Sequence, residues 1–189
     1  KFPGQFREIG MVMNWIYEKA DDYQMDTDRI FLIGDSAGGH FAAMYTNICV
    51  NRDYAKELHE FRPDVFNETL VPADFVPRAV GLHCGAYSMV SQAEDRKSLE
   101  GKCFYNYFES TAGKTELELA DVPSHVTEDF PPTFIFTAEN DFLKAQMPKL
   151  TARFDEAGVK YVSHIYGAGN PEIGHVFHCN IRLPEAKLC

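Results

Sequence analysis

The sequence predicts an α/β fold in which a mostly parallel sheet carries helices on both faces. Four short apolar segments of strand length are separated by segments whose apolar residues recur every three or four positions. Strands that alternate with helices in this way are typical of parallel sheets. The chain has 189 residues, enough for one domain with a sizeable core, so we expect a single domain over residues 1–189.

One stretch joins a strand to a helix through a serine flanked by glycines. Residues 30–33 form an uninterrupted apolar run, which indicates a strand buried on both faces. Gly34-Asp35-Ser36-Ala37-Gly38 follows, and apolar residues at helical spacing predict a helix from there to about residue 50. A serine at the corner between a strand and a helix is the context of a nucleophile elbow. We therefore interpret Ser36 as a candidate nucleophile.

The turn around Ser36 is expected to be strained. We expect a Cβ atom at Gly34 or at Gly38 to collide with the neighbouring strand or helix. The helix that starts after Ser36 has free N–H groups at its N-terminus, and these favour negative charge developing beside the serine oxygen.

The rest of the N-terminal half is predicted from periodicity and composition. Apolar residues step by three and four through residues 6–20, which predicts an amphipathic helix. Residues 51–75 mix charges and prolines with few periodic apolar positions, so we expect an irregular excursion over the surface. Residues 78–85 are predicted to form a second buried strand.

A long segment, residues 87–130, contains no obvious strand. Insertions of this length are often lids or binding loops, so we expect a lid-like insertion here. It holds a cluster of four aromatic residues, namely Phe104, Tyr105, Tyr107 and Phe108. Two interpretations remain open, since these aromatics could line a binding site or form a small core of the insertion itself.

The C-terminal part repeats the order strand, helix, strand. Residues 133–138 are predicted to be the third strand, and residues 147–157 carry a helical apolar stripe. Gly158 suits the C-terminal cap of that helix. Residues 160–166 are predicted to be the fourth strand, and a loop rich in glycine and proline covers residues 167–174.

Three side chains that follow predicted strands have the types that serine catalysis requires. A serine hydroxyl needs a base, nearly always histidine, and a group that holds this histidine in the right tautomer. In open parallel sheets, reactive groups gather at the carboxyl ends of the strands. Ser36 follows the first predicted strand, Asp141 the third and His175 the fourth. This order of nucleophile, acid and base is the one expected for a hydrolase of this architecture.

Other residues compete for these roles. Glu139 lies in the same loop as Asp141, and we prefer Asp141 because Glu139 comes so soon after the strand, whereas Asp141 opens the next segment. Ordinary packing or a surface position is the default interpretation of six further histidines, which are His40, His59, His83, His125, His164 and His178.

Composition argues against several classes of function. The formal net charge is −10 with no basic cluster, which argues against binding to nucleic acid or to an anionic membrane surface. No apolar run approaches the length of a membrane span. The five cysteines are odd in number and lack paired zinc or redox spacing, which favours reduced thiols in a cytoplasmic protein.

A family is recognisable from these motifs. The run Gly34-Asp35-Ser36-Ala37-Gly38-Gly39 resembles the nucleophile motif of the α/β-hydrolase fold, specifically the esterase and lipase branch similar to hormone-sensitive lipase and bacterial acetyl esterases. The likeness extends over nearly the whole chain through four further motifs, which are Phe2-Pro3, Asp28-Arg29-Ile30, Pro131-Pro132 and Gly174-His175-Val176-Phe177. Thr137-Ala138 departs from the His-Gly that often precedes the acid in that branch.

The resemblance implies a serine esterase acting on small acyl esters without a metal or organic cofactor. Carried over by position, Ser36 is the nucleophile, Asp141 the orienting acid and His175 the base. Ala37 then offers one backbone N–H to the oxyanion hole. Residues expected to line the substrate pocket are Asp35, Tyr87, Phe104 and Tyr105.

Two departures from the family bear on activity and assembly. Family members carry earlier strands and a His-Gly-Gly loop that donates N–H groups to the oxyanion, and this sequence has no such motif. The chain therefore looks like the C-terminal portion of a longer enzyme, and we expect it to be a poor catalyst alone. The strand at residues 30–33 would also lack the neighbouring strand that the family fold places beside it. Such an open edge can pair with another chain, so we expect a homo-oligomer.

Two alternatives remain open. A serine peptidase resembling the prolyl oligopeptidase group would share the same three residues, although the Asp-Ser-Ala context and the missing propeller domain argue against it. A non-catalytic hydrolase-fold module, used for binding or assembly, is the second alternative.

Overall fold

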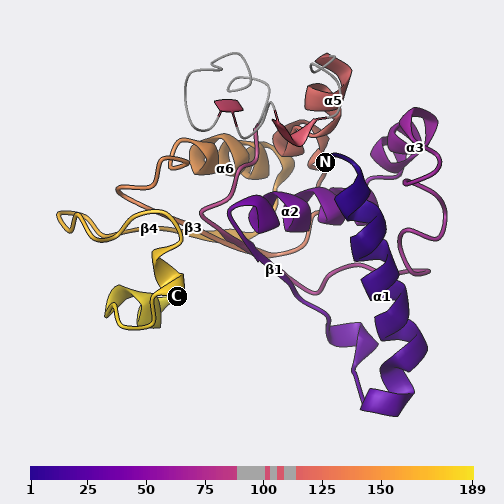
Figure 1. Cartoon of the computed structure of the whole chain (residues 1–189), viewed down its shortest axis with the longest axis horizontal. Helices are drawn as coiled ribbons and strands as arrows, with labels where there is room; N and C mark the ends of the chain where they lie inside the picture. The colour runs from indigo at the N-terminus through magenta and orange to yellow at the C-terminus, as the bar shows by residue number, and fades with distance from the viewer. Residues whose placement is uncertain (89–100, 103–105, 109–113) are drawn as a thin grey trace.

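A computed structural model of the chain describes residues 1–88, 101–102, 106–108 and 114–189. Its centre is a sheet of four parallel strands in the order β1-β2-β3-β4 (Figure 1). The strands are β1 (Leu32–Asp35), β2 (Val80–His83), β3 (Thr133–Ala138) and β4 (Tyr161–Tyr166). The predicted parallel α/β architecture is confirmed, and each strand lies within two residues of its expected bounds.

Two helices cover one face of the sheet. In Figure 1, α2 (Ala37–Val50) and α6 (Gln146–Ala157) lie on the same side of the strands. The helix α2 packs against β1 and β2, and its buried residues include Ala43, Met44 and Ile48. The helix α6 ends at Gly158, whose φ of 73° makes it the left-handed cap predicted from the sequence.

The remaining helices surround this layer. The long helix α1 (Gly4–Tyr23) is amphipathic as expected and buries Phe6 and Met13. It is followed by a short 3₁₀ helix, Thr27–Arg29, that leads into β1. The short helix α5 (Lys114–Leu119) precedes β3, and a 3₁₀ helix, Val122–His125, lies between them. No helix in the described part of the chain is long and apolar enough to cross a membrane.

The second face of the sheet is partly open. The residues Ile33, Gly81, Phe134 and Val162 are paired across the four strands and therefore share this face. Ile33 is 69% exposed and Val162 is 55% exposed. The C-terminal segment lies on this side with two short 3₁₀ helices, Phe177–Cys179 and Glu185–Leu188 (Figure 1).

The expectation that the first strand is buried on both faces is wrong. Residues along β1 alternate between half-buried and exposed, and Phe31 just before the strand is 55% exposed. The reason is its position at the edge of the described sheet, where β1 pairs with β2 alone. Apolar sequence therefore marks the strand without showing that both faces are covered.

The expectation of an irregular excursion over residues 51–75 is also wrong in its first part. Arg52–Phe61 forms the helix α3, and the side chain of Asn51 caps its start by accepting a hydrogen bond from the Tyr54 N–H. Tyr54 and Leu58, four residues apart, are its buried positions. This narrow apolar stripe within a charged segment explains why composition alone suggested a loop.

Part of the aromatic cluster in the predicted insertion belongs to the main core. The rings of Tyr107 and Phe108 pack against Phe2, with centroid distances of 5.7 and 5.4 Å. These two rings therefore join the core under α1 and do not form a separate one. Phe104 and Tyr105 lie outside the described residues, and the lid-like role of residues 87–130 remains a prediction.

Candidate active site

The turn between β1 and α2 holds Ser36 in an unusual backbone conformation. Its φ and ψ are 54° and −119°, a combination that costs energy for any residue with a side chain. The Ser36 N–H donates to the His83 carbonyl at 2.9 Å, which fixes the turn to the end of β2. The serine thus projects from the carboxyl edge of the sheet, as the sequence predicts.

The two glycines of the turn have different roles. A Cβ atom at Gly34 would lie 2.1 Å from the backbone oxygen of Gly38, so a side chain there requires the turn to move. A Cβ atom at Gly38 would have no heavy atom within 4 Å. The predicted collision is therefore confirmed at Gly34 and wrong at Gly38, because the start of α2 directs that position into open space.

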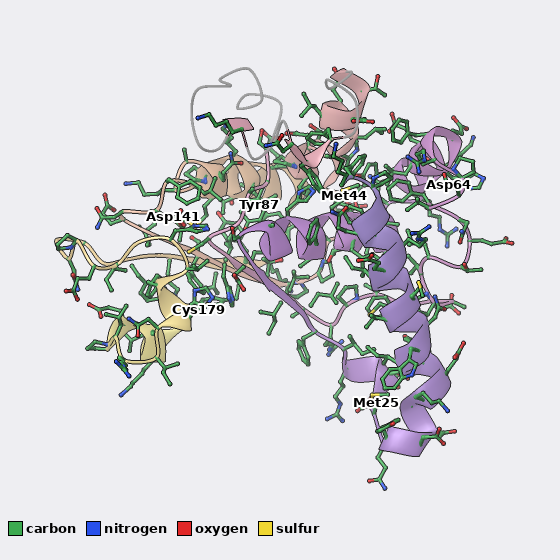
Figure 2. The ribbon with its side chains drawn as sticks, viewed as in Figure 1. Met25, Met44, Asp64, Tyr87, Asp141 and Cys179 are labelled. Carbon is green, nitrogen blue, oxygen red and sulfur yellow. The ribbon has the colours of Figure 1, made fainter. Side chains whose placement is uncertain are left out.

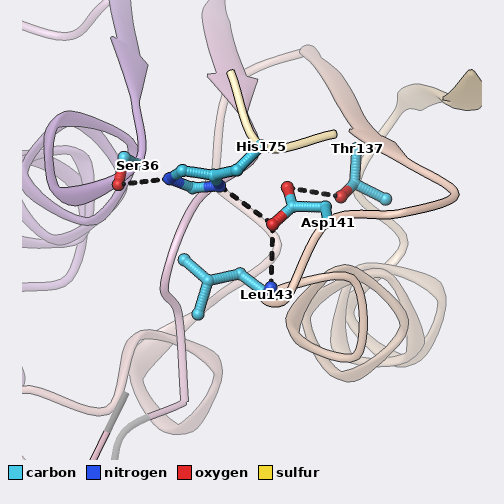
Figure 3. A network of polar contacts seen from close by, with 5 residues as sticks. All are labelled: Ser36, Thr137, Asp141, Leu143 and His175. Atoms are coloured by element: carbon cyan, nitrogen blue, oxygen red, sulfur yellow. Dashed lines mark hydrogen bonds and ion pairs between the residues drawn. The ribbon is translucent and has the colours of Figure 1, made fainter. Parts of the chain in front are cut away.

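The structure brings Ser36, Asp141 and His175 together. Nε2 of His175 lies 2.9 Å from Oγ of Ser36, and Nδ1 lies 2.9 Å from Oδ1 of Asp141 (Figure 3). In the tautomer that satisfies both contacts, Nδ1–H donates to the carboxylate and Nε2 accepts from the hydroxyl. Such an arrangement can pass the serine proton to the imidazole while the carboxylate stabilises the resulting positive charge.

Two donors hold the Asp141 carboxylate, whose side chain is fully buried. Oδ1 also accepts from the Leu143 N–H at 2.8 Å, and Oδ2 accepts from the Thr137 hydroxyl at 3.0 Å (Figure 3). The competing acid Glu139 instead pairs with Lys144 at 2.8 Å and is 45% exposed in its side chain. The geometry therefore places Asp141, and not Glu139, beside His175.

Among the described residues, His175 is the histidine that contacts the Ser36 hydroxyl, and the other histidines have different surroundings. His40 is 1% exposed, and burial lowers its pKa to about 3. Burial, with the nearby His178, lowers the pKa of His83 to about 4, and the pKa of His178 is also lowered, chiefly by burial. His164 lies exposed on β4.

Sequence reasoning missed Cys84, which lies beside the candidate acid and base. Ligand atoms of Cys84, Asp141 and His175 all lie within 4.8 Å of one another. Burial and the neighbouring Asp141 raise the pKa of the Cys84 thiol, so it is neutral at pH 7. Cys84 directly follows β2, so the strand-end rule that selected the other residues would also have found it.

The residues predicted to line a substrate pocket have varied surroundings. Ala37 opens α2 beside Ser36, where its N–H is one of the free donors of the helix. Asp35 is exposed near His178 and Cys179, on the other side of β1 from α2. Tyr87 is fully buried, with its hydroxyl against the backbone at Gly85. Phe104 and Tyr105 lie outside the described residues.

Comparison with known proteins places this geometry in a family. A model of the alpha/beta hydrolase fold matches residues 1–179. A search of the curated proteins found no match.

Several solved structures share the fold. One is esterase B from Lactobacillus rhamnosis, with 24% identity over 98% of this chain and 57% of that chain, and a TM-score of 0.77. A structure from work on two Rhizomucor miehei esterases has 23% identity over 100% of this chain and 57% of its own, with a TM-score of 0.72. An acetyl ester-xyloside bifunctional hydrolase from Caldicellulosiruptor lactoaceticus has 16% identity over 99% of this chain and 62% of its own, with a TM-score of 0.74.

The chain thus spans about three-fifths of the length of these solved structures, and at such identities the likeness concerns the fold. The family match covers nearly all of its residues. The chain belongs to the alpha/beta hydrolase fold family.

Proposed function

We propose that this chain carries the nucleophile, the base and the orienting acid of a serine carboxylic-ester hydrolase acting on small acyl esters such as acetyl esters. The observation that carries the proposal is the pair of 2.9 Å contacts that His175 makes with Ser36 and Asp141. Esterases among the solved structures of the same fold support the class of substrate.

The reaction follows from the positions of these three side chains. Ser36 Oγ attacks the acyl carbon while its proton moves to Nε2 of His175, and Asp141 stabilises the imidazolium. His175 then protonates the departing alcohol oxygen, which leaves an acyl group on Ser36. A water molecule, deprotonated by His175, then attacks that acyl group. The bond between the acyl carbon and Ser36 Oγ breaks, His175 returns the proton to Oγ, and the carboxylic acid leaves.

The oxyanion of the intermediate needs hydrogen-bond donors. The Ala37 N–H is the donor that the start of α2 offers, and the His-Gly-Gly loop of the resembling esterases has no counterpart in this sequence. Loss of one such donor costs about 2.7–4 kcal/mol, or 10²–10³ in rate. We therefore expect hydrolysis by this chain to be slow, whereas labelling of Ser36 by a reactive phosphonate depends less on turnover.

The test is covalent labelling of the chain by a fluorophosphonate, with the modified peptide located by mass spectrometry. We expect one phosphonyl group on Ser36, and no labelling in Ser36→Ala. Ser163→Ala, which removes an exposed serine on β4, is the matched control and should label normally. Intact, folded chain that does not label at Ser36 would favour the non-catalytic module.

A panel of substrates separates the two enzymatic alternatives. We expect slow hydrolysis of p-nitrophenyl acetate that disappears in Ser36→Ala. Cleavage of X-Pro amides in preference to acyl esters would instead support a peptidase of the prolyl oligopeptidase type.

We further propose that the chain associates with itself through the free edge of β1 and works in the cytoplasm. The exposed Phe31 and Ile33 at that edge support the first part. The cysteines within the described residues, namely Cys49, Cys84, Cys179 and Cys189, are free thiols, which supports a reducing compartment.

A further inference from the structure

A second group of polar side chains lies close to the candidate active site but outside it. Asp35 at the end of β1 and His178 and Cys179 in the C-terminal segment each present one atom able to bind a metal ion. These three atoms all lie within 4.8 Å of one another. Figure 2 labels Cys179 on the C-terminal segment, which lies on the opposite side of the strands from α2 and α6.

The two ligand atoms of the C-terminal segment are spaced as one metal ion would require. Nε2 of His178 lies 3.8 Å from Sγ of Cys179. In tetrahedral zinc sites, with Zn–N of about 2.0–2.1 Å and Zn–S of about 2.3 Å, two such atoms are separated by about 3.5 Å. The ring nitrogen of His178 beside the thiol is Nε2. The other ring nitrogen, Nδ1, is buried and has no hydrogen-bond partner among the described residues.

We propose that Asp35, His178 and Cys179 together bind one divalent transition-metal ion of the Zn²⁺ type. Their donors are a carboxylate oxygen, an imidazole nitrogen and a thiolate sulfur, a set that suits Zn²⁺ and does not suit Mg²⁺ or Ca²⁺. On binding, the Cys179 thiol releases its proton to solvent, and the ion accepts lone pairs from the thiolate, the imidazole and the carboxylate. Three protein ligands leave the fourth position to water.

Neighbouring residues help to orient these ligands. The ring of His83 lies edge-on to that of His178, with centroids 5.0 Å apart, and limits its rotation. Asp35 is anchored in β1, in register with His83 of β2. The Cys179 N–H donates to the Val176 carbonyl at 3.0 Å, which fixes Cys179 within its own turn.

A bound ion would connect the two parts of the chain that carry the nucleophile and the base. Asp35 directly precedes Ser36, and the short 3₁₀ helix that contains His178 and Cys179 begins two residues after His175. An ion shared by these residues would therefore restrict movement of the His175 loop relative to the turn at Ser36. It takes no part in the proposed ester hydrolysis, because its ligands lie on the other side of β1 from α2.

The test is a titration of the reduced 189-residue chain with Co²⁺, a spectroscopic substitute for Zn²⁺. We expect binding of one Co²⁺ ion per chain, with a thiolate-to-cobalt charge-transfer band in the near ultraviolet and visible bands of tetrahedral cobalt. Added Zn²⁺ should displace the Co²⁺ and remove these bands. The readout does not depend on activity, so its failure would leave the proposed esterase function standing.

Variants identify the ligands. Cys179→Ser should abolish the charge-transfer band, and Asp35→Asn and His178→Gln should weaken Co²⁺ binding. Cys189→Ser removes another exposed thiol of the C-terminal segment and should leave the spectrum unchanged, as should His164→Gln on β4.

Two outcomes would overturn the proposal. One is a folded chain that binds no Co²⁺, and the other is a band that survives in Cys179→Ser. If that surviving band is lost in Cys84→Ser, the ion lies among Cys84, Asp141 and His175 instead. Circular dichroism of each variant separates the loss of a ligand from the loss of the fold.

Discussion

The Thr137 hydroxyl donates a hydrogen bond to Oδ2 of Asp141 at 3.0 Å, within β3 and the turn that follows it. Both residues are buried, and the other carboxylate oxygen of Asp141 faces His175. Thr137 is therefore a positioning residue, which acts on His175 through the orientation of the carboxylate. This threonine stands in the Thr-Ala pair that departs from the His-Gly of the resembling esterases.

Replacing Thr137 by valine should slow phosphonylation of Ser36. The change keeps the side chain's shape but leaves one buried carboxylate oxygen without its donor. A hydrogen bond to a charged group contributes about 1.5–3 kcal/mol, so we expect a loss of about tenfold to a hundredfold in labelling rate. The rate of Ser36 phosphonylation is measured from the reaction with a fluorophosphonate, quenched at a series of times.

Two further variants separate positioning from stability. Thr137→Ser keeps the hydroxyl and should restore most of the rate. Thr133→Val removes a buried hydroxyl from the other end of β3, where it donates to the Pro131 carbonyl at 2.9 Å, and should leave the labelling rate unchanged. Equal slowing in Thr133→Val and Thr137→Val would show that Thr137 acts only through the fold.

Replacing Gly34 by alanine should distort the turn that holds Ser36. The added Cβ would lie 2.1 Å from the Gly38 oxygen and 2.3 Å from its carbonyl carbon, both backbone atoms that cannot rotate away. We expect a loss of about 1–3 kcal/mol in the free energy of unfolding, typical of overpacking, together with slower labelling of Ser36. Urea denaturation followed by circular dichroism measures the stability.

Gly38→Ala is the matched control, because it adds the same methyl group four residues later into open space. Alanine is favoured over glycine in a helix by about 1 kcal/mol, so stability should be unchanged or raised. A loss in Gly38→Ala as large as that in Gly34→Ala would contradict the steric account.

The strands could be predicted because their signal is local. The bounds of β3 match the expected residues 133–138, since an apolar run there is preceded by two prolines. The convergence of Ser36, Asp141 and His175 follows from the parallel sheet, which carries residues distant in sequence to one edge.

What the sequence could not provide depends on tertiary placement. The exposure of Ile33 follows from its strand lying at the edge, which an apolar run does not reveal. The direction of a Cβ at Gly38 depends on how α2 leaves the turn. The cluster of Asp35, His178 and Cys179 depends on the C-terminal segment folding onto the second face of the sheet.

The buried His40 should make stability depend on pH. Burial lowers its folded pKa to about 3, whereas an unfolded histidine titrates near 6.5. Below pH 6.5 the unfolded chain therefore binds a proton that the folded chain does not, and stability falls as pH falls. The slope approaches about 1.4 kcal/mol per pH unit well below pH 6.5, which amounts to about 2 kcal/mol between pH 7 and 5.

Urea denaturation at pH 7 and pH 5 tests this dependence. His40→Leu replaces the ring by an apolar side chain without a titrating group and should lose less stability over this interval than the unaltered chain. His164→Gln, at an exposed position on β4, should lose as much as the unaltered chain. A His40→Leu variant with the full pH-dependent loss would show that other groups cause it.

The free edge of β1 should lead the chain to associate with itself. In the described part of the chain β1 pairs with β2 alone, and an open apolar groove of about 510 Å³ lies between α1 and β1. Unpaired backbone groups beside exposed apolar side chains favour pairing with another strand. We expect the average mass measured by light scattering to rise with protein concentration.

A lysine on this edge should oppose that association. Ile33→Lys places a charge on the exposed face of β1. Because charged side chains on edge strands oppose pairing with another chain, this variant should shift the protein toward a monomer. Val162→Lys is the matched control, because Val162 lies in the same row across the sheet but on β4, at the opposite edge. If both variants reduce the mass equally, the contact is not specific to the β1 edge. A chain that is monomeric at every concentration would contradict the proposed association.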